Sequence, residues 1–213
     1  MNDLRVDWMI LVVAIILGIL FRKKNWYPEL SSLPYFLIFT ICIELIGRYY
    51  RLRSINNVPL FNMFSVLQLC YFTWLIFRIQ KKAYIRSFII LVPLICLINI
   101  IGIQGLKTFH TYSYSISIIL IVWLCIDYYI VTFKKADVEN LLKEPNFWFI
   151  TALLTYYTTS ISILGILNYI SGLPPEIIKL TRKILLNVNS IFYTLLIVAF
   201  LCKIPIQKFI RNS

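Results

Sequence analysis

Charged residues are scarce in this 213-residue chain, at 14% of the sequence, whereas ordinary soluble proteins contain about 25%. Histidine occurs once, and the five cysteines form no CxxC pair or other spacing typical of a metal site. Glycine occurs only 6 times, which counts against large hinge motions. These absences argue against a soluble domain, a disulfide framework and a zinc site, so we predict no metal ion and no cofactor.

Hydrophobic residues, in contrast, make up 60% of the chain, and the mean hydropathy is +0.82. A soluble fold of this size has too little interior to hide such an excess over the usual share of about 45–50%. The charges occur in short clusters between long apolar segments, as membrane-spanning helices require. The sequence therefore predicts an all-α integral membrane protein of the cell (inner) membrane, with the lipid bilayer as a partner.

The net charge of +12 would suggest a nucleic-acid partner in a soluble protein. Here the basic residues stand at the ends of apolar segments. In that position they anchor helices and contact anionic lipid headgroups. We therefore predict no nucleic-acid partner.

A transmembrane helix needs about 20 apolar residues, and seven segments approach or exceed this length. The first follows Asp3 and Asp7 and precedes the basic cluster Arg22, Lys23 and Lys24. A secretory signal has its positive charge in front, so we interpret this segment as a span. The loops are short, which predicts one domain over residues 1–213. The predicted spans are residues 8–21, 33–50, 60–77, 84–103, 109–133, 147–170 and 181–202.

The distribution of Lys and Arg among the loops predicts the orientation, because cytoplasmic loops carry an excess of positive charge. With the N-terminus outside, thirteen basic residues fall on the inner side and eight on the outer side. We therefore expect an N-out, C-in bundle. We also expect Pro93 to kink the fourth span, and the Pro174-Pro175 pair to open the last helix ahead of its span.

Charged and amide side chains at bilayer depth usually face the bundle interior and mark a functional site. In the helix predicted at residues 33–50, Glu44 and Arg48 lie one turn apart on the same face. Polar side chains from other predicted helices fall at a similar depth in the outer half. We therefore predict an outward-facing pocket that binds a small polar or anionic ligand. The predicted ligand-binding residues are Glu44, Arg48, Asn62, Gln68, Asn187 and Asn189.

Five further residues are secondary candidates, and plainer roles compete with a functional one. Hydroxyl groups such as those of Thr158 and Ser162 often bond their own backbone or join neighbouring helices. Asp127 would pair with a lysine of the nearby loop, and Glu44 with Arg48 would form a structural ion pair. The first span carries no polar residue, so we expect it to face lipid. The secondary candidates are His110, Asp127, Thr158, Ser162 and Arg182.

A faint internal repeat relates the two halves of the chain. Thr40, Glu44 and Gly47 follow the same spacing as Thr158, Ser162 and Gly165, and the Asn62 to Ile79-Gln80-Lys81 interval equals that from Asn189 to Ile206-Gln207-Lys208. This is compatible with three helices, a linker helix and three more. The layout resembles that of the SWEET sugar transporters. Their proline-based helix motif is missing, however, because Pro34 and Pro145 stand only at or before the starts of the second and sixth spans.

Three functions fit these features, and we expect the first. A sensor-like or accessory subunit would bind its ligand in the outer pocket, and a membrane or cytoplasmic protein partner would carry the signal. A small-solute transporter would use the same pocket, as the SWEET-like layout implies. An intramembrane lipid-modifying enzyme would need titratable groups within reach of one another, and Glu44 with His110 is the only outer pair that qualifies. We predict no catalytic residue, because no HExxH or GxSxG motif is present.

Overall fold

The computed structural model describes residues 6–22, 28–134, 138–167 and 174–202. None of these residues lies in a β-strand, which confirms the predicted all-α fold class. Each predicted span overlaps a helix, although residues 168–170 of the sixth span lie outside the described residues. The described residues form seven α-helices: α1 (Val6–Arg22), α2 (Leu33–Leu52), α3 (Val58–Gln80), α4 (Ala83–Ile98), α5 (Thr111–Lys134), α6 (Pro145–Leu167) and α7 (Pro175–Leu201).

Proline in the first turn starts several of these helices, where its missing N–H has no helical acceptor to lose. It occupies this place in α2, α3, α6 and α7. The predicted opening of the last helix at Pro174-Pro175 is thus confirmed. α4 runs through Pro93 to Ile98 and continues as a π-helical turn, Asn99–Ile103. Short 3-10 turns, Pro28–Leu30 and Val138–Lys143, precede α2 and α6.

Five helical segments of the described chain are long and apolar enough to cross a membrane. They are Pro28–Leu52, Val58–Gln80, Ala83–Ile103, Thr111–Lys134 and Pro175–Leu201. α1 is shorter, with 17 residues, and α6 has 23 residues but carries many Thr and Tyr side chains. The chain is therefore a bundle in which several apolar helices have the length of a membrane span.

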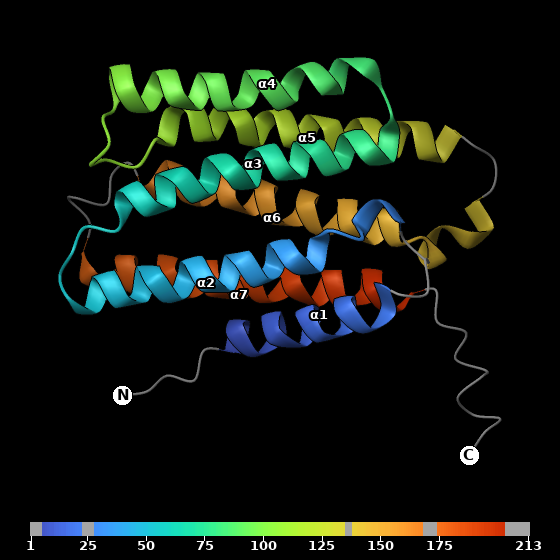
Figure 1. Ribbon diagram of the computed structural model, residues 1–213, viewed down its shortest axis with the longest axis horizontal. Helices are drawn as coiled ribbons and strands as arrows, with labels where there is room; N and C mark the ends of the chain where they lie inside the picture. Colours follow the sequence, from blue (N-terminus) through green and yellow to red (C-terminus); the bar gives the residue numbers. More distant parts are fainter. Residues whose placement is uncertain (1–5, 23–27, 135–137, 168–173, 203–213) are drawn as a thin grey trace.

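Six helices form a closed ring, and α4 lies outside it against α3 (Figure 1). Around the ring, α1 packs on α2, α2 on α3, α3 on α5, α5 on α6, α6 on α7, and α7 on α1. We call the end at which α1, α3, α5 and α7 begin the outer end, after the predicted orientation, and the opposite end the inner end. Packing contacts between helices that are far apart in the sequence, such as α1 and α7, close the ring.

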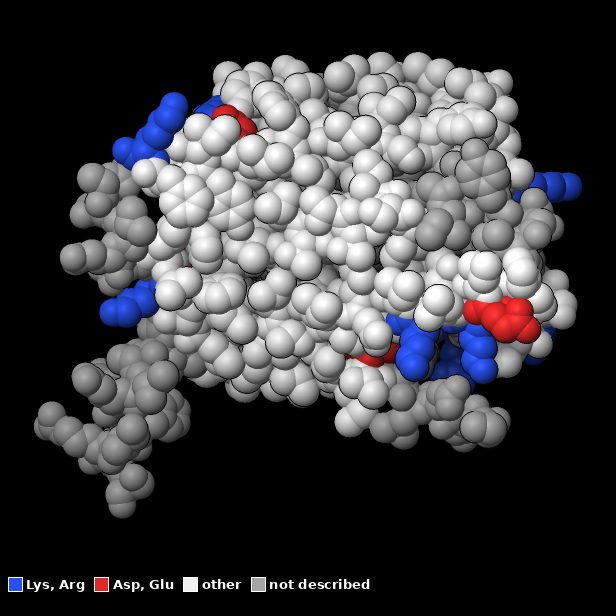
Figure 2. Space-filling model, turned by 180° about the vertical axis from the view of Figure 1, so that it is seen from behind, with Lys and Arg blue, Asp and Glu red and all other residues white. Residues whose placement is uncertain are grey.

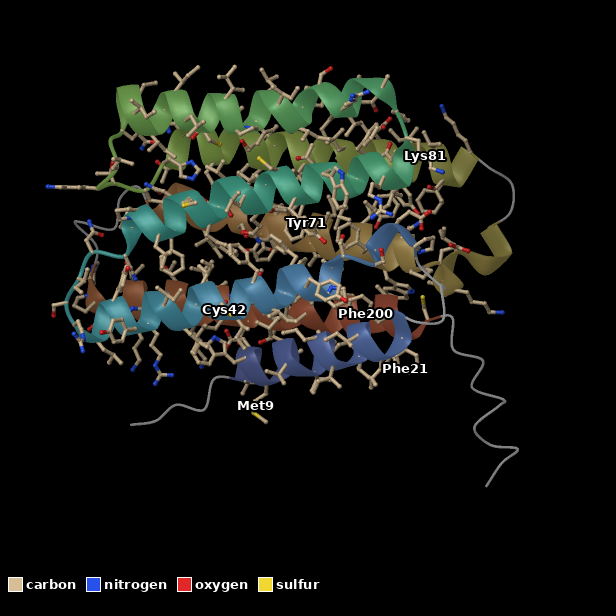
Figure 3. All side chains as sticks on the ribbon, in the orientation of Figure 1. Met9, Phe21, Cys42, Tyr71, Lys81 and Phe200 are labelled. Atoms are coloured by element: carbon tan, nitrogen blue, oxygen red, sulfur yellow. The ribbon has the colours of Figure 1, made fainter. Side chains whose placement is uncertain are left out.

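Aromatic side chains fill the interior of the ring around Phe72 of α3. The Phe72 ring packs edge-on against Phe149 and Tyr157 of α6 and Phe192 of α7, with centroids 6.1–6.2 Å apart. Tyr71 projects from α3 towards α2 (Figure 3), where its ring stacks on Phe36 at 4.1 Å and its hydroxyl bonds Ser32 at 2.9 Å. These contacts join α2, α3, α6 and α7 in one core.

The first helix does not lie wholly in lipid, contrary to the expectation from its sequence. Leu11 and Ala14 are fully buried in the core. The opposite face, which includes Met9, is exposed, and Met9 points away from the bundle in Figure 3. Only one face of α1 is therefore accessible from outside the bundle, because α1 packs between α2 and α7.

Candidate functional site

Glu44 on α2 lies at the junction of α1 and α2, near the indole of Trp8 and the guanidinium of Arg48. The Trp8 indole N–H of α1 donates a hydrogen bond to Glu44 Oε2, although the two residues are 36 positions apart. The Arg48 guanidinium lies over the Trp8 ring, 5.5 Å from its centroid, and its side chain is exposed. The Glu44 side chain is half-buried.

Tyr156 of α6 extends this polar group across the ring. Its side chain interacts with Gln68 of α3, Tyr114 of α5 and Ser160, and it lies within the electrostatic reach of Glu44. The hydroxyl of the adjacent Tyr157 is buried and makes no hydrogen bond among the described residues. We call Trp8, Glu44, Gln68 and Tyr156, which come from four helices, the Glu44 cluster.

A second polar group surrounds His110, which is fully buried just before α5. Its ring nitrogens contact two serine hydroxyls, Nε2 with Ser65 at 2.5 Å and Nδ1 with Ser113 at 2.9 Å. Asn62 of α3 holds the same loop, since its amide donates to the Thr108 carbonyl at 2.8 Å and its oxygen accepts from the His110 N–H at 3.3 Å. We call these residues, with Asn99, the His110 network.

Burial of His110 favours a neutral imidazole, because a charged ring is costly away from water. Ser65 donates its hydroxyl proton to the Asn62 carbonyl at 2.9 Å, so it accepts from His110 Nε2–H. Ser113 Oγ lies 2.9 Å from Nδ1, donates to the His110 carbonyl at 3.3 Å and accepts from the Asn99 amide at 3.0 Å. Each ring nitrogen thus has a hydroxyl partner, and satisfied buried polar networks typically fix a packing arrangement.

The structure therefore divides the predicted pocket residues between separate places. Glu44 and Gln68 belong to the Glu44 cluster, Arg48 flanks it, and Asn62 belongs to the His110 network together with the secondary candidate His110. Asn187 is exposed on α7 and Asn189 is half-buried. The Arg182 side chain lies outside the described part of the structure.

The threonine hydroxyls of α6 bond mostly to their own helix. Thr158 Oγ1 donates to the Leu154 carbonyl at 2.6 Å, Thr151 to Phe147 and Thr159 to Thr155, both at 2.8 Å. Thr158 and Ser162 are exposed on the bundle surface. Back-bonding of this kind is the usual role of hydroxyls in membrane helices.

Asp127 of α5 pairs with a loop lysine at the inner end. Lys82 Nζ lies 2.5 Å from its carboxylate, and the Tyr84 hydroxyl donates to the same oxygen. Partial burial lowers the pKa of Lys82, but the hydrogen bonds with Asp127 and Tyr84 outweigh it and raise the pKa above its ordinary value. Because the pKa of Lys82 is raised, its positive charge is present at neutral pH and is lost as the pH rises through that pKa.

This pair links the α3–α4 loop to α5, and we expect a small coupling energy because both side chains are partly exposed. Lys82→Met and Asp127→Asn should each destabilise the protein slightly. Their double mutant should reveal a coupling of about 0.2–1 kcal/mol. Thermal unfolding of the wild type, the two single mutants and the double mutant in detergent measures the coupling energy. A coupling energy well above this range at neutral pH would contradict the description of a partly exposed, solvent-screened ion pair.

Several residues of the two polar groups were not expected from the sequence. Trp8 and Tyr156 were not among the predicted site residues, because only the tertiary contacts show what their polar atoms meet. Asn99 and Gln104 lie in a π-helical turn and loop, and an amide of Asn99 donates to Gln104 at 2.7 Å. A π-helical turn is often found near functional sites, but no sequence signal marked it.

No metal-binding group stands out in the described part of the chain, where no three His, Cys, Asp or Glu side chains gather. The Glu44 cluster offers one carboxylate, one amide, one phenol and one indole, a set suited to hydrogen bonding rather than to metal coordination. Comparisons of the chain with protein-family models, with curated proteins and with solved structures found no match.

Proposed function

We propose that the protein spans the membrane with seven helices, N-out and C-in, and binds a small polar ligand at the Glu44 cluster as a sensor-like or accessory membrane subunit. The observation that carries this proposal is the convergence of Trp8, Glu44, Gln68 and Tyr156 from four helices. Ionisable groups at bilayer depth are costly and usually mark function. The buried hydroxyl of Tyr157, which is adjacent in sequence to Tyr156, makes no hydrogen bond among the described residues and offers a further hydrogen-bonding group.

Seven crossings fit the lengths and the surroundings of the two helices that look least like spans. α1 has 17 residues and is about 25 Å long at 1.5 Å per residue, close to the roughly 30 Å of a hydrocarbon core. α6 packs between α5 and α7, which shield its tyrosines, and its exposed Thr158 hydroxyl bonds its own helix. α1 begins and α7 ends at opposite ends of the bundle (Figure 1), as an odd number of crossings requires.

A thermal-shift screen of the detergent-solubilised protein tests the ligand site. The library contains sugars, organic acids, nucleotides and lipid headgroups. A ligand that binds the folded protein at 100 times its Kd should stabilise it by about 2.7 kcal/mol and raise the Tm. Glu44→Gln keeps an acceptor for the Trp8 indole but removes the charge, so we expect the shift to be lost while the unliganded Tm changes little.

Glu176→Gln is the matched control, because Glu176 is an exposed acid at the start of α7. This variant should keep the full ligand shift. A ligand whose shift survives Glu44→Gln would bind elsewhere and remove the Glu44 cluster as the site. An empty screen would favour a structural subunit or a lipid-acting enzyme.

A small-solute transporter is the second candidate, and the order of helices in the ring supports it. If α1, α2 and α3 are matched to α5, α6 and α7, every helix contact in the ring has a counterpart. The α1–α2 contact corresponds to α5–α6, α2–α3 to α6–α7, and α3–α5 to α7–α1, and α4 stands outside as a linker. This is the packing expected of two parallel three-helix repeats. The repeat residues Gln207 and Lys208 lie outside the described residues. Uptake of a screened ligand into proteoliposomes, abolished by Glu44→Gln, would favour transport over sensing.

A further inference from the structure

The outer end of the ring has a step, because α1 starts well below its neighbours. Gly18 of α1 lies against Pro34 of α2 and Phe200 of α7, which sets the three helices in register. From that level, α1 runs 12 residues to Val6, α2 runs 18 to Leu52 and α7 runs 25 to Pro175. At 1.5 Å per residue these lengths are about 18, 27 and 38 Å. α2 and α7 thus project beyond the start of α1, as Figure 1 shows.

Basic side chains line the two helices that rise above this step. Arg48 and Arg51 belong to α2, and Lys179 and Lys183 lie one turn apart on α7. All four side chains are exposed. Figure 2 shows basic side chains gathered at this end of the molecule next to an acidic group. We call Arg48, Arg51, Lys179 and Lys183 the outer step.

Among the described residues near the step, Asp7 and Glu44 are the less accessible acidic groups and Glu176 is the accessible one. Asp7 is 2% exposed and Glu44 is half-buried, so both lie at the base of the step. Glu176 is exposed, but it stands at the start of α7, nearly one turn further out than Lys179. The exposed charges described around the outer step are therefore mostly positive, which favours an anionic partner.

The surface directly below the outer step is apolar. Met9, Val13, Ile16 and Leu20 of α1 are 45–61% exposed and follow one another at helical spacing on one face. An anion bound at the step would thus lie immediately above a strip suited to an acyl chain. A soluble phosphate would use only the cations, whereas an anionic phospholipid would use both features.

We propose that the outer step, with the exposed face of α1 beneath it, is a binding site for the phosphate headgroup and acyl chain of an anionic phospholipid of the outer leaflet. The proposal rests on the proposed membrane embedding and orientation, but not on a ligand at Glu44. Arginine and lysine at a membrane surface bind phosphate through charge-assisted hydrogen bonds. The occupant is identified by this pairing of charge with an apolar strip.

Native mass spectrometry of the full chain in detergent tests the site with phosphatidylglycerol and phosphatidylcholine as probes. We expect phosphatidylglycerol to bind preferentially at low ionic strength. Lys179→Gln/Lys183→Gln should weaken its binding by about fivefold for each lysine removed, a typical effect for a cation at an anionic surface. Added salt should weaken it further, because exposed charges are screened.

The matched control is Lys81→Gln/Arg86→Gln, which removes two exposed cations from the inner end. It should leave the tight binding of phosphatidylglycerol unchanged, as should Glu44→Gln, so failure of the Glu44 site does not affect this test. Equal binding of the two lipids, or an equal loss in the control, would overturn the proposal. Stabilisation by inorganic phosphate as large as that by phosphatidylglycerol would overturn the lipid assignment. Arg51→Gln provides a second variant if the lysine pair alters folding, judged by its Tm without lipid.

Discussion

Replacing Gly18 with leucine should destabilise the bundle by about 3 kcal/mol or more, at the upper end of what overpacking costs. A Cβ atom at Gly18 would lie 2.6 Å from Pro34 Cγ and 3.0 Å from the Phe200 ring. The proline ring is tied to the α2 backbone and cannot rotate away. α1 would have to move away from both α2 and α7, which would also separate Trp8 from Glu44. Thermal unfolding in detergent and the yield of monodisperse protein measure the effect.

Gly102→Leu is the matched control, because nothing lies within 4 Å of a Cβ built there. This residue is exposed in the π-helical turn after α4, so the substitution should leave the Tm nearly unchanged. A Gly18→Leu protein as stable as the control would mean that α1 does not pack in the register described above. The basis of the outer step would then be lost as well.

Replacing Asn62 with leucine should cost about 2–4 kcal/mol, because it removes the two hydrogen bonds that the Asn62 side chain makes with the loop before α5. The His110 N–H would be left buried without an acceptor, at about 1–3 kcal/mol, and the bond to the Thr108 carbonyl would be lost. Hydrogen exchange should show faster opening of the loop around His110, together with a lower Tm. The ligand shift at the Glu44 cluster should persist in the molecules that remain folded.

Asn187→Leu makes the same chemical change at an exposed position of α7. It should alter the stability by less than about 0.5 kcal/mol, as surface substitutions usually do. Comparing the two stability changes tests whether Asn62 and Asn187, which the sequence analysis assigned to one pocket, lie in different surroundings. Equal effects of the two substitutions would contradict the buried position of Asn62 in the His110 network.

The candidate site was predictable in part, and the division follows from physics. Glu44 and Gln68 stand out in sequence because a carboxylate and an amide in apolar helices are costly unless they face protein. Helical periodicity gives the face of a residue on its own helix, but not which helix that face meets. Asn62 and Gln68 differ by less than two turns of α3, yet they contact different partners, His110 and Tyr156. Tryptophan and tyrosine carry a polar atom on an apolar ring, so the sequence did not indicate that Trp8 and Tyr156 would form hydrogen bonds in the site.

The sequence by itself determined that the chain is all-helical, where its helices lie, and that they have the length and composition of membrane spans. Those properties depend on local pattern: apolar runs, prolines at helix starts and charges at helix ends. Only the tertiary structure decided that α4 stands outside a six-helix ring, that α1 is clamped at Gly18 between Pro34 and Phe200, and that Trp8 meets Glu44. These are contacts between distant segments, and they arise from the fit of side-chain shapes and hydrogen-bonding groups that no single helix contains.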